Sequence, residues 1–459
     1  MLSESLRASA NRQTEAWQLI PVTVHYLQEA LGCAAQFLRF DGRAKAYVQV
    51  DPPRQIAELL LAKRGAWKLP ELAGVINTPF LRADGSICET PGYDLQSKLL
   101  FKPEAQVFPA VPASPGKTDA EAALGEFKAL LEEFPFPTPA DRSVALAGLL
   151  TIVDRRSMDT APLFGFTAPA AGTGKSLLVD LMSIIATGRR MPVMSAGKSE
   201  EEFEKRLGAA LIAGDMAISI DNCDADLGGA LLCQCLTQGE LNVRQLGHSR
   251  YVGVVTSATF YATGNNLTLI GDLTRRALLC SLDAGMERPE LRTFKRDVVK
   301  IAFDRRNELV IAGLTILRAW HLAKLAGESV RADTFGGFEQ WSSRVREALI
   351  WLGQADPCET IGNVRDRDPA REQLGAVLEQ WNQHLRIGER YSVKDVIETA
   401  ISAPLFHAAL MNVAGGQGTL MVSPERLGRW LKKVNGKIVR QLSLHHTGIL
   451  NGFSMWKLQ

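Results

Sequence analysis

The chain has 459 residues, which is enough for about three domains at roughly 150 residues each. Hydrophobic residues make up 46% and charged residues 22% of it, and this composition excludes an intrinsically disordered protein. The formal net charge is only +2, so any surface that binds nucleic acid must be a local patch. No apolar run approaches the roughly 18 residues that span a bilayer, so we expect no membrane segment.

The cysteine content and the start of the chain indicate a cytoplasmic protein. The seven cysteines are scattered, and their odd number predicts unpaired thiols in a reducing compartment. Cys233 and Cys235 form the single close pair, and no second Cys/His pair stands at ligand spacing, so we expect no zinc site. The polar start Met1–Arg12 contains no apolar stretch of the signal-peptide type.

The first part of the chain, residues 1–110, predicts a small α+β domain. Ile56–Lys63 has the pattern of a helix, and Leu81–Ile87 that of a hairpin in which Asp84-Gly85 supplies the positive φ angles of a tight turn. Pro and Gly in Val111–Lys117 indicate a linker in which nothing can pack, and we place the linker at 111–119.

The central part, residues 120–325, predicts an α/β fold. Helices are expected at Ala120–Glu133 and Asp141–Arg155, followed by short apolar runs that alternate with amphipathic helices. This alternation predicts a parallel sheet covered by helices. The runs are Leu163–Thr167, Met191–Met194, Met216–Ile220, Thr259–Ala262 and Leu278–Leu282. A long helical stretch, Leu291–Leu325, ends this part, and residues 326–459 are expected to form a helical region and a small mixed C-terminal domain.

A phosphate-binding loop is predicted directly after the first of these runs. Pro169–Ser176 (PAAGTGKS) lies between an expected strand and the expected helix Leu177–Ile185, which is the context that the motif requires. Lys175 would neutralise the β- and γ-phosphate oxygens of ATP, and Ser176 would bind Mg²⁺. The motif's first Gly is replaced by Pro169, so that turn must be built differently, and the alternative is a Gly-rich turn that only starts a helix. The predicted ATP-binding residues are Ala170, Ala171, Gly172, Thr173, Gly174, Lys175, Ser176 and Leu177.

The run Met216–Ile220 ends at Asp221, where a carboxylate can reach the Mg²⁺ beside the phosphates. Many such ATPases carry a second acid immediately afterwards to polarise the attacking water. Asn222 stands at that position and Asp224 follows, so Asp221 is assigned to the metal and the water-positioning residue stays open. The alternative for Asp221 is an ordinary turn residue at the end of a strand.

Two further polar segments follow in the order expected of an ATPase. Asn265 ends the next run, and its amide can sense the γ-phosphate or the attacking water, although Asn-rich turns are common. Arg275 and Arg276 come next, and an arginine at a subunit edge can reach a neighbour's γ-phosphate; the alternative is a surface pair at a helix end. The predicted catalytic residues are Lys175, Asp221, Asn265, Arg275 and Arg276, and the predicted metal ligands are Ser176 and Asp221.

This ordered set of motifs resembles the AAA+ ATPases of helicase superfamily 3, in particular the helicase half of phage and plasmid primase–helicases. The resemblance covers about the central third of the chain, through Ala168–Ser176, Ile218–Asp221, Leu241–Val254, Tyr261–Asn266 and Asp272–Leu282. It implies an AAA+ P-loop core and a ring, usually a hexamer, with ATP at subunit interfaces and single-stranded DNA in the central channel. The N-terminal part departs from the full-length proteins because it carries no zinc-binding Cys cluster and no acidic set of a primase, so a primase is expected on another polypeptide.

Leu241–Val254 lies where this family carries its pore hairpin. Apolar alternation on either side of a Gly-His-Ser turn independently predicts two strands joined by a turn. Arg244, His248 and Arg250 would then face DNA phosphates. The alternative is a hairpin that stabilises the sheet edge with solvated charges.

The C-terminal segment predicts a winged-helix-like domain, which this family often carries. Pro424–Lys433 has the pattern of a helix, and strand-like Ile438–Leu444 and Gly452–Leu458 follow. From residue 424 to the end, seven Lys and Arg stand against a single acid, which suits phosphate contact. The candidates for DNA binding are Arg429, Lys432 and Lys433, and the alternative is a winged helix that docks on protein.

The predicted function is an ATP-driven, ring-forming DNA helicase for the replication of a phage, plasmid or integrated mobile element. Its cofactors would be ATP and Mg²⁺, and its partners single-stranded DNA, duplex DNA as a further candidate, copies of the same chain and a primase. One alternative is an AAA+ switch, such as a loader or a defence ATPase, that assembles on DNA without unwinding it, and a second is an AAA+ remodeller of proteins. The basic tail argues against the remodeller, whereas Asn222 keeps the switch open.

Overall fold

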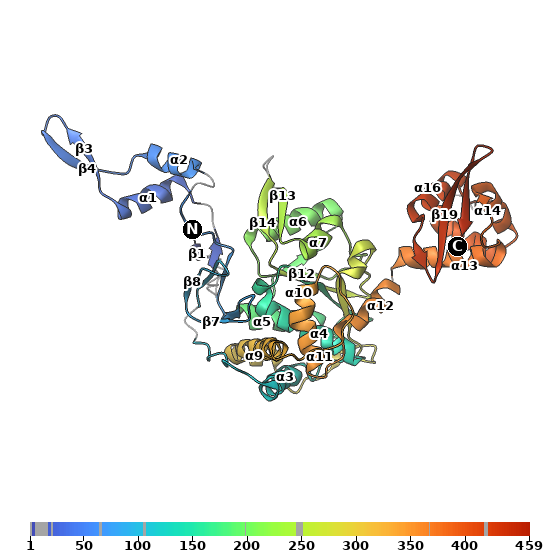
Figure 1. Cartoon of the computed structure of the whole chain (residues 1–459), viewed down its shortest axis with the longest axis horizontal. Coiled ribbons are helices and arrows are strands. Elements are labelled where there is room, and N and C mark those ends of the chain that lie inside the picture. The colour runs from blue at the N-terminus through green and yellow to red at the C-terminus, as the bar shows by residue number, and fades with distance from the viewer. Residues whose placement is uncertain are drawn as a thin grey trace.

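The computed structural model describes residues 2–4, 17–19, 22–63, 67–103, 107–197, 199–244, 251–366, 368–416 and 421–459. Along the longest axis, an N-terminal helix-and-hairpin segment, a central α/β unit and a C-terminal unit follow one another (Figure 1). No helix among these residues is long and apolar enough to cross a membrane.

The centre of the molecule is a five-stranded sheet in which every pair of neighbours is parallel, in the order β11-β12-β15-β10-β16. The predicted α/β class with a parallel sheet is confirmed, since each of the five apolar runs contributes a strand that begins within two residues of its expected position. The strands are β10 (Leu163–Ala168), β11 (Val193–Ser195), β12 (Ala217–Asp221), β15 (Thr259–Asn265) and β16 (Ala277–Ser281). Because β12, β15 and β10 are neighbours, their carboxyl ends lie side by side at one edge of the sheet.

Helices cover this sheet and form its core. Helix α4 (Pro139–Asp154) is buried almost all round, because it packs against β16 and against the helices α5 (Lys175–Thr187) and α9 (Arg306–Leu325). Its start is well defined, since Thr138 and Asp141 form a capping box and Pro139 occupies the first turn. Asp141 also accepts a hydrogen bond of 2.6 Å from the backbone N–H of Ser281, which fixes the end of β16 to this helix.

Two expectations for the central part are wrong in detail. Helix α3 (Lys117–Leu131) begins at the end of the predicted linker, and Val111 is buried in the main core, so that segment does pack. The stretch 291–325 is not one helix: α8 (Val298–Asp304) and α9 are separate, and residues 292–297 are not helical. Arg292 and Arg296 in that segment donate hydrogen bonds to backbone carbonyls of Glu133 and Ala129, so it crosses the end of α3 instead of winding into a helix.

The N-terminal residues contain short elements. The predicted helix at 56–63 is present as α2, and the predicted hairpin at 81–87 as β6 and β7, with Gly85 at a φ of 77° in its turn. The elements are β1 (Leu2–Glu4), β2 (Trp17–Leu19), α1 (Val24–Ala34), β3 (Phe37–Asp41), β4 (Ala46–Val50), α2 (Arg54–Ala62), β5 (Gly74–Ile76), β6 (Phe80–Leu81), β7 (Ile87–Cys88), β8 (Gly92–Asp94) and β9 (Leu99–Phe101).

The C-terminal residues form a unit with a hydrophobic core of its own, built around Trp381, Phe406 and Trp456. Its four-stranded sheet has the order β17-β20-β19-β18. The predicted helix at 424–433 and the predicted strand at 452–458 are present. The single strand predicted at 438–444 is wrong, because a turn at Arg440 and Gln441, both at positive φ, divides it into two antiparallel strands, the second of which extends to Leu450. The elements are α13 (Pro369–His384), β17 (Tyr391–Ser392), α14 (Val393–Ile401), α15 (Pro404–Ala414), α16 (Pro424–Val434), β18 (Ile438–Val439), β19 (Leu442–Leu450) and β20 (Phe453–Leu458). Helices α10 (Glu339–Trp341), α11 (Glu347–Trp351) and α12 (Thr360–Asp366) lie between α9 and this unit in the chain.

A buried ion pair joins three separate pieces of the central unit. The carboxylate of Asp154 at the end of α4 is completely buried and lies 2.7 Å from the guanidinium of Arg344, which follows α10. The other oxygen of Asp154 accepts from the backbone N–H of Leu81 and from the hydroxyl of Ser157. Burial raises the pKa of Asp154 and Arg344 opposes that rise, so the pair depends on both partners.

We therefore expect Arg344→Ala to lower the free energy of unfolding by about 3 kcal/mol, because it leaves a buried carboxylate without its cation. Urea unfolding followed by tryptophan fluorescence measures this loss. The control is Lys205→Ala, which removes an exposed i,i+4 pair with Glu201 and should cost less than about 1 kcal/mol. Equal losses in the two variants would contradict this role for the Asp154 pair.

Candidate active site

The loop after β10 has the backbone of a phosphate-binding turn. Gly172 and Gly174 adopt φ angles of 76° and 103°, in the region that glycine enters without strain. A Cβ at position 172 would lie 2.8 Å from the Cβ of Glu290, so this position has no room for a side chain. Helix α5 begins at Lys175 without a side-chain cap, which leaves its first N–H groups for an anion. The predicted strand–loop–helix context is therefore present.

Lys175 is held at this loop by neutral acceptors. Its ammonium donates to the side-chain oxygen of Asn265 at 2.8 Å, to the carbonyl of Ala170 at 3.2 Å and to the hydroxyl of Thr173 at 3.4 Å. Partial burial lowers the pKa of Lys175, while the negative charge of Asp221 acts in the opposite direction. The cation is thus positioned without a direct carboxylate partner, as binding of a phosphate requires.

Ser176 and Asp221 come together beside Lys175. The hydroxyl of Ser176 lies 3.2 Å from a carboxylate oxygen of Asp221, and the hydroxyl of Thr263 donates to the same oxygen. A hydroxyl and a carboxylate at this distance are the hard oxygen ligands that Mg²⁺ takes together with phosphate oxygens and water. No group of three or more His, Cys, Asp or Glu among the described residues could hold a metal ion by itself.

Thr263 is a site residue that the sequence analysis missed. Its hydroxyl also accepts from the backbone N–H of Asn222 at 3.2 Å, so it joins the ends of β12 and β15. The signal available in the sequence was a hydroxyl residue two positions before Asn265 in an otherwise apolar strand. Asn222 has a φ of 52° and its amide donates to Asp224 at 3.3 Å. The position after Asp221 therefore presents an amide and no carboxylate.

Arg275 and Arg276 have different environments in the turn Gly271–Arg275. Arg276 keeps only 15% of its side chain exposed, pairs with Asp272 at 2.6 Å and donates to the carbonyl of Cys233 and the hydroxyl of Thr237 on α7 (Ala230–Thr237). Arg275 pairs with Asp272 as well, but half of its side chain is exposed. Within the described chain, neither arginine has a hydrogen bond or ion pair with the residues around Lys175.

The predicted hairpin at 241–254 has its two strands in place. Strands β13 (Glu240–Arg244) and β14 (Tyr251–Val255) lie side by side (Figure 1). They pair antiparallel, with Arg244 opposite Tyr251. Leu241 and Val243 are buried toward α6 (Glu200–Ala213), and Arg244 is exposed. His248 and Arg250 lie outside the described residues, so of the three predicted DNA contacts the structure places only Arg244.

Arg429, Lys432 and Lys433 are exposed on α16 of the C-terminal unit. They belong to the part of the molecule at the opposite end from α1 and α2, beyond the central sheet (Figure 1). The structure therefore brings together Lys175, Ser176, Asp221 and Asn265, and it keeps the predicted C-terminal DNA contacts on a separate unit.

No protein-family model matches the sequence, and neither does any curated protein. Among solved structures, the apo A form of the NrS-1 C-terminal region has a TM-score of 0.40 and 13% identity, and the match covers 94% of this chain and 98% of that one. JCV helicase bound to a phenylacetamide compound has a TM-score of 0.21 and 13% identity, over 55% of this chain and 74% of its own. At these values the likeness carries no argument about function, which has to come from the residues.

We expect Lys175→Ala to abolish nucleotide hydrolysis in a folded protein, because it removes the cation that would neutralise the β- and γ-phosphates. Phosphate release with ATP, together with circular dichroism for the fold, measures this. Lys128→Ala, on the exposed face of α3, is the matched control and should hydrolyse ATP normally. Near-normal turnover by folded Lys175→Ala would refute the phosphate-loop assignment.

Proposed function

We propose that this chain is an ATP-driven, ring-forming DNA helicase that serves the replication of a phage, plasmid or integrated mobile element. The observation that supports the proposal best is the meeting of Lys175 with Asn265, and of Ser176 with Asp221, at the carboxyl edge of the sheet. Such a site suits a nucleoside triphosphate with its magnesium ion, and a helicase is driven by hydrolysis of such a nucleotide.

The roles of the residues follow from their contacts. Lys175 and the uncapped N–H groups at the start of α5 would hold the β- and γ-phosphates, and Ser176 and Asp221 would hold Mg²⁺. Magnesium, when bound, neutralises the charge that develops on the transferred phosphoryl group. Asn265 engages Lys175 through its oxygen, which leaves its NH₂ group to donate to a phosphate or to the attacking water. Thr263 orients the carboxylate of Asp221.

Ring formation is proposed because, among the described residues, no arginine is hydrogen-bonded to Lys175, Ser176, Asp221 or Asn265. Arg275 is half exposed and has no contact with the Lys175 site in the described part of its own chain, so we assign it to the nucleotide of a neighbouring subunit. A hexamer with single-stranded DNA in its channel is the assembly that the motif order favours. Arg244 and the rest of the hairpin between β13 and β14 would contact the strand in that channel.

A second candidate rests on Asn222. The amide at this position, turned to Asp224, leaves no carboxylate directly after Asp221 to polarise a water. An ATPase of this kind could bind ATP, assemble on DNA and hydrolyse slowly, and thereby act as a switch. ATP hydrolysis measured with and without single-stranded DNA separates the two: strong stimulation favours the helicase, and slow hydrolysis that DNA does not change favours the switch.

We expect Arg275→Ala to slow hydrolysis on the order of 10³-fold while ATP binding and stability remain, because loss of a transition-state arginine has this effect. Arg276→Ala should instead lower the melting temperature, since its bonds hold the turn to α7. Mixing Arg275→Ala with Lys175→Ala under conditions of subunit exchange should restore part of the activity, because the two defects then fall on different interfaces. Absence of any recovery would contradict action across a subunit interface.

We also expect DNA contact to divide between the hairpin and α16. Replacing Arg244, His248 and Arg250 by Ala should remove the stimulation of hydrolysis by single-stranded DNA. Replacing Arg429, Lys432 and Lys433 should weaken binding at every sequence and lower the slope of log K against log salt by roughly 0.9 per lost duplex phosphate contact. ATP hydrolysis with and without single-stranded DNA measures the first effect, and a salt titration of DNA affinity measures the second. Unchanged slopes with intact stimulation in both variants would favour a protein remodeller.

A further inference from the structure

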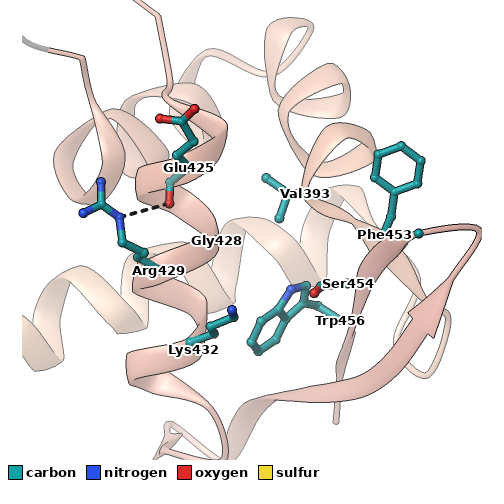
Figure 2. A pocket seen from close by; sticks show the side chains of 9 residues that line it. Val393, Glu425, Gly428, Arg429, Lys432, Phe453, Ser454 and Trp456 are labelled. Atoms are coloured by element: carbon teal, nitrogen blue, oxygen red, sulfur yellow. Dashed lines mark hydrogen bonds between the residues drawn. The ribbon is translucent and has the colours of Figure 1, made fainter.

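A pocket of about 280 Å³ lies between α16 and β20 in the C-terminal unit. Figure 2 shows Lys432 on α16 directed toward Trp456 of β20, with Ser454 and Phe453 of the same strand further along. The guanidinium of Arg429, another residue of the lining, is turned to the other side of α16, where its Nε donates to the carbonyl of Glu425. This pocket is distant from the Lys175 site in the fold, and none of its lining residues belongs to the proposed nucleotide site.

The polar groups of this pocket are mostly hydrogen-bond donors. Lys432 brings one cation to the pocket and Arg429 a second at its edge, and neither forms an ion pair with another described residue. Trp456 is 1% exposed, and its indole N–H has no hydrogen-bond partner in the described chain. An unmet buried donor costs free energy. This nitrogen is covered from solvent, so an acceptor bound in the pocket would reach it only after a shift of the side chains around it. Glu425 is the single acid on the rim, and two cations beside an unmet N–H still favour an anion.

The hairpin between β19 and β20 ends in an apolar tip next to this pocket. Leu450 pairs with Phe453 across Asn451 and Gly452, whose φ angles of 50° and 82° are those of a tight type I′ turn. Three large apolar side chains are nevertheless solvent-exposed there: Ile449 at 73%, Leu450 at 53% and Phe453 at 59%.

Charge and shape together indicate the occupant. Residues 424–459 carry seven Lys and Arg against one acid, and among them Arg440 is neutralised by Glu379. A polyanion suits this surface, and DNA supplies phosphates at regular spacing. An apolar tip gains nothing from phosphates, but it can pack against the flat face of a base, as apolar wedges and aromatic platforms do. Base faces are exposed at the end of a duplex and are covered within it.

We propose that the C-terminal unit binds the end of a DNA duplex, with a backbone phosphate in the α16–β20 pocket and the terminal base pair against the tip formed by Ile449, Leu450 and Phe453. The proposal rests on DNA as the partner of the proposed helicase and adds what part of the DNA this unit selects. In a helicase such a contact would hold the duplex end at the point where strands separate.

The tip is tested with the full chain and two DNA duplexes of identical sequence, one with open ends and one closed at both ends by loops. The wild type should bind the open duplex roughly tenfold more tightly. The double variant Leu450→Ser, Phe453→Ser should lose that preference, and a fluorescent adenine analogue at the terminal pair should no longer respond. The control is Ile401→Ser, Leu405→Ser, which alters apolar side chains of the same unit that are 73% and 72% exposed. It should keep the preference.

The pocket is tested by Trp456→Phe, which removes the N–H and keeps an aromatic ring. Affinity for the open duplex should fall roughly tenfold with an unchanged salt slope, because a hydrogen bond to an anion is lost but no charge. Trp381→Phe is the matched control: Trp381 is buried in the same core with an unpartnered indole N–H, but it does not line the pocket. If Trp456→Phe does not fold, exposed Lys432→Gln serves instead and should reduce both affinity and slope.

Equal affinity of the wild type for open and closed duplexes would overturn the proposal, as would equal effects of Trp456→Phe and Trp381→Phe. If single-stranded DNA still stimulates hydrolysis in that case, end binding is rejected and the helicase proposal is kept. A preference for open ends without any stimulated hydrolysis would support end binding and overturn the helicase. Failure to bind DNA in any form would overturn both.

Discussion

The register of three parallel strands sets the distance on which the proposed nucleotide site depends. Ala168, the last residue of β10, pairs with Asn265, the last residue of β15, so the phosphate loop and this amide leave the sheet at the same level. The bond of 2.8 Å between Lys175 and Asn265 follows from that pairing. Gly165 lies in the middle of β10, where a Cβ would stand 2.9 Å from the Leu279 side chain, so a larger residue would push β10 and β16 apart. The close packing of β10 against β16 therefore helps to fix the positions of the polar side chains at the carboxyl edge of the sheet.

The same edge keeps opposite charges near each other without pairing them. Lys175 bonds to an amide, a carbonyl and a hydroxyl, whereas Asp221 accepts from the hydroxyls of Ser176 and Thr263. A direct Lys175–Asp221 salt bridge would satisfy both charges and would have to be broken before a phosphate and a metal could bind. Neutral partners orient both groups and leave the cation free for an anion and the carboxylate free for a cation. This division explains why hydroxyl and amide residues, rather than further charges, surround the site.

Much of the sheet was predictable from the sequence because a strand buried on both faces must be apolar throughout, as Leu163–Ala168 is. The strand–loop–helix turn at 169–176 was predictable because its glycines and lysine are adjacent in the chain. Thr263 was not, because its role depends on the pairing of β12 with β15, which the sequence does not state. The helix expected at 291–325 failed for a similar reason, since Arg292 and Arg296 bind carbonyls of α3 from far along the chain. The length of β19 was underestimated because His445-His446-Thr447-Gly448 interrupts the apolar alternation. Asn451-Gly452 is the strongest local signal in the sequence for the hairpin that follows this strand.

The two proposed sites are joined by one continuous path of packed elements. Helix α12 packs on β16 and on the turn that carries Arg275, and Thr360 at its start accepts a hydrogen bond from the backbone N–H of Leu279 in β16. Helix α12 also contacts α13, whose buried Trp381 lies in the core that supports Trp456 and the hairpin tip. The C-terminal unit is therefore anchored at the element that presents the arginine proposed to act on a neighbour's nucleotide. A force on a duplex end bound as proposed would be borne at that anchor, so the proposed DNA contact and the proposed subunit interface would share this mechanical support although their residues lie far apart in the fold.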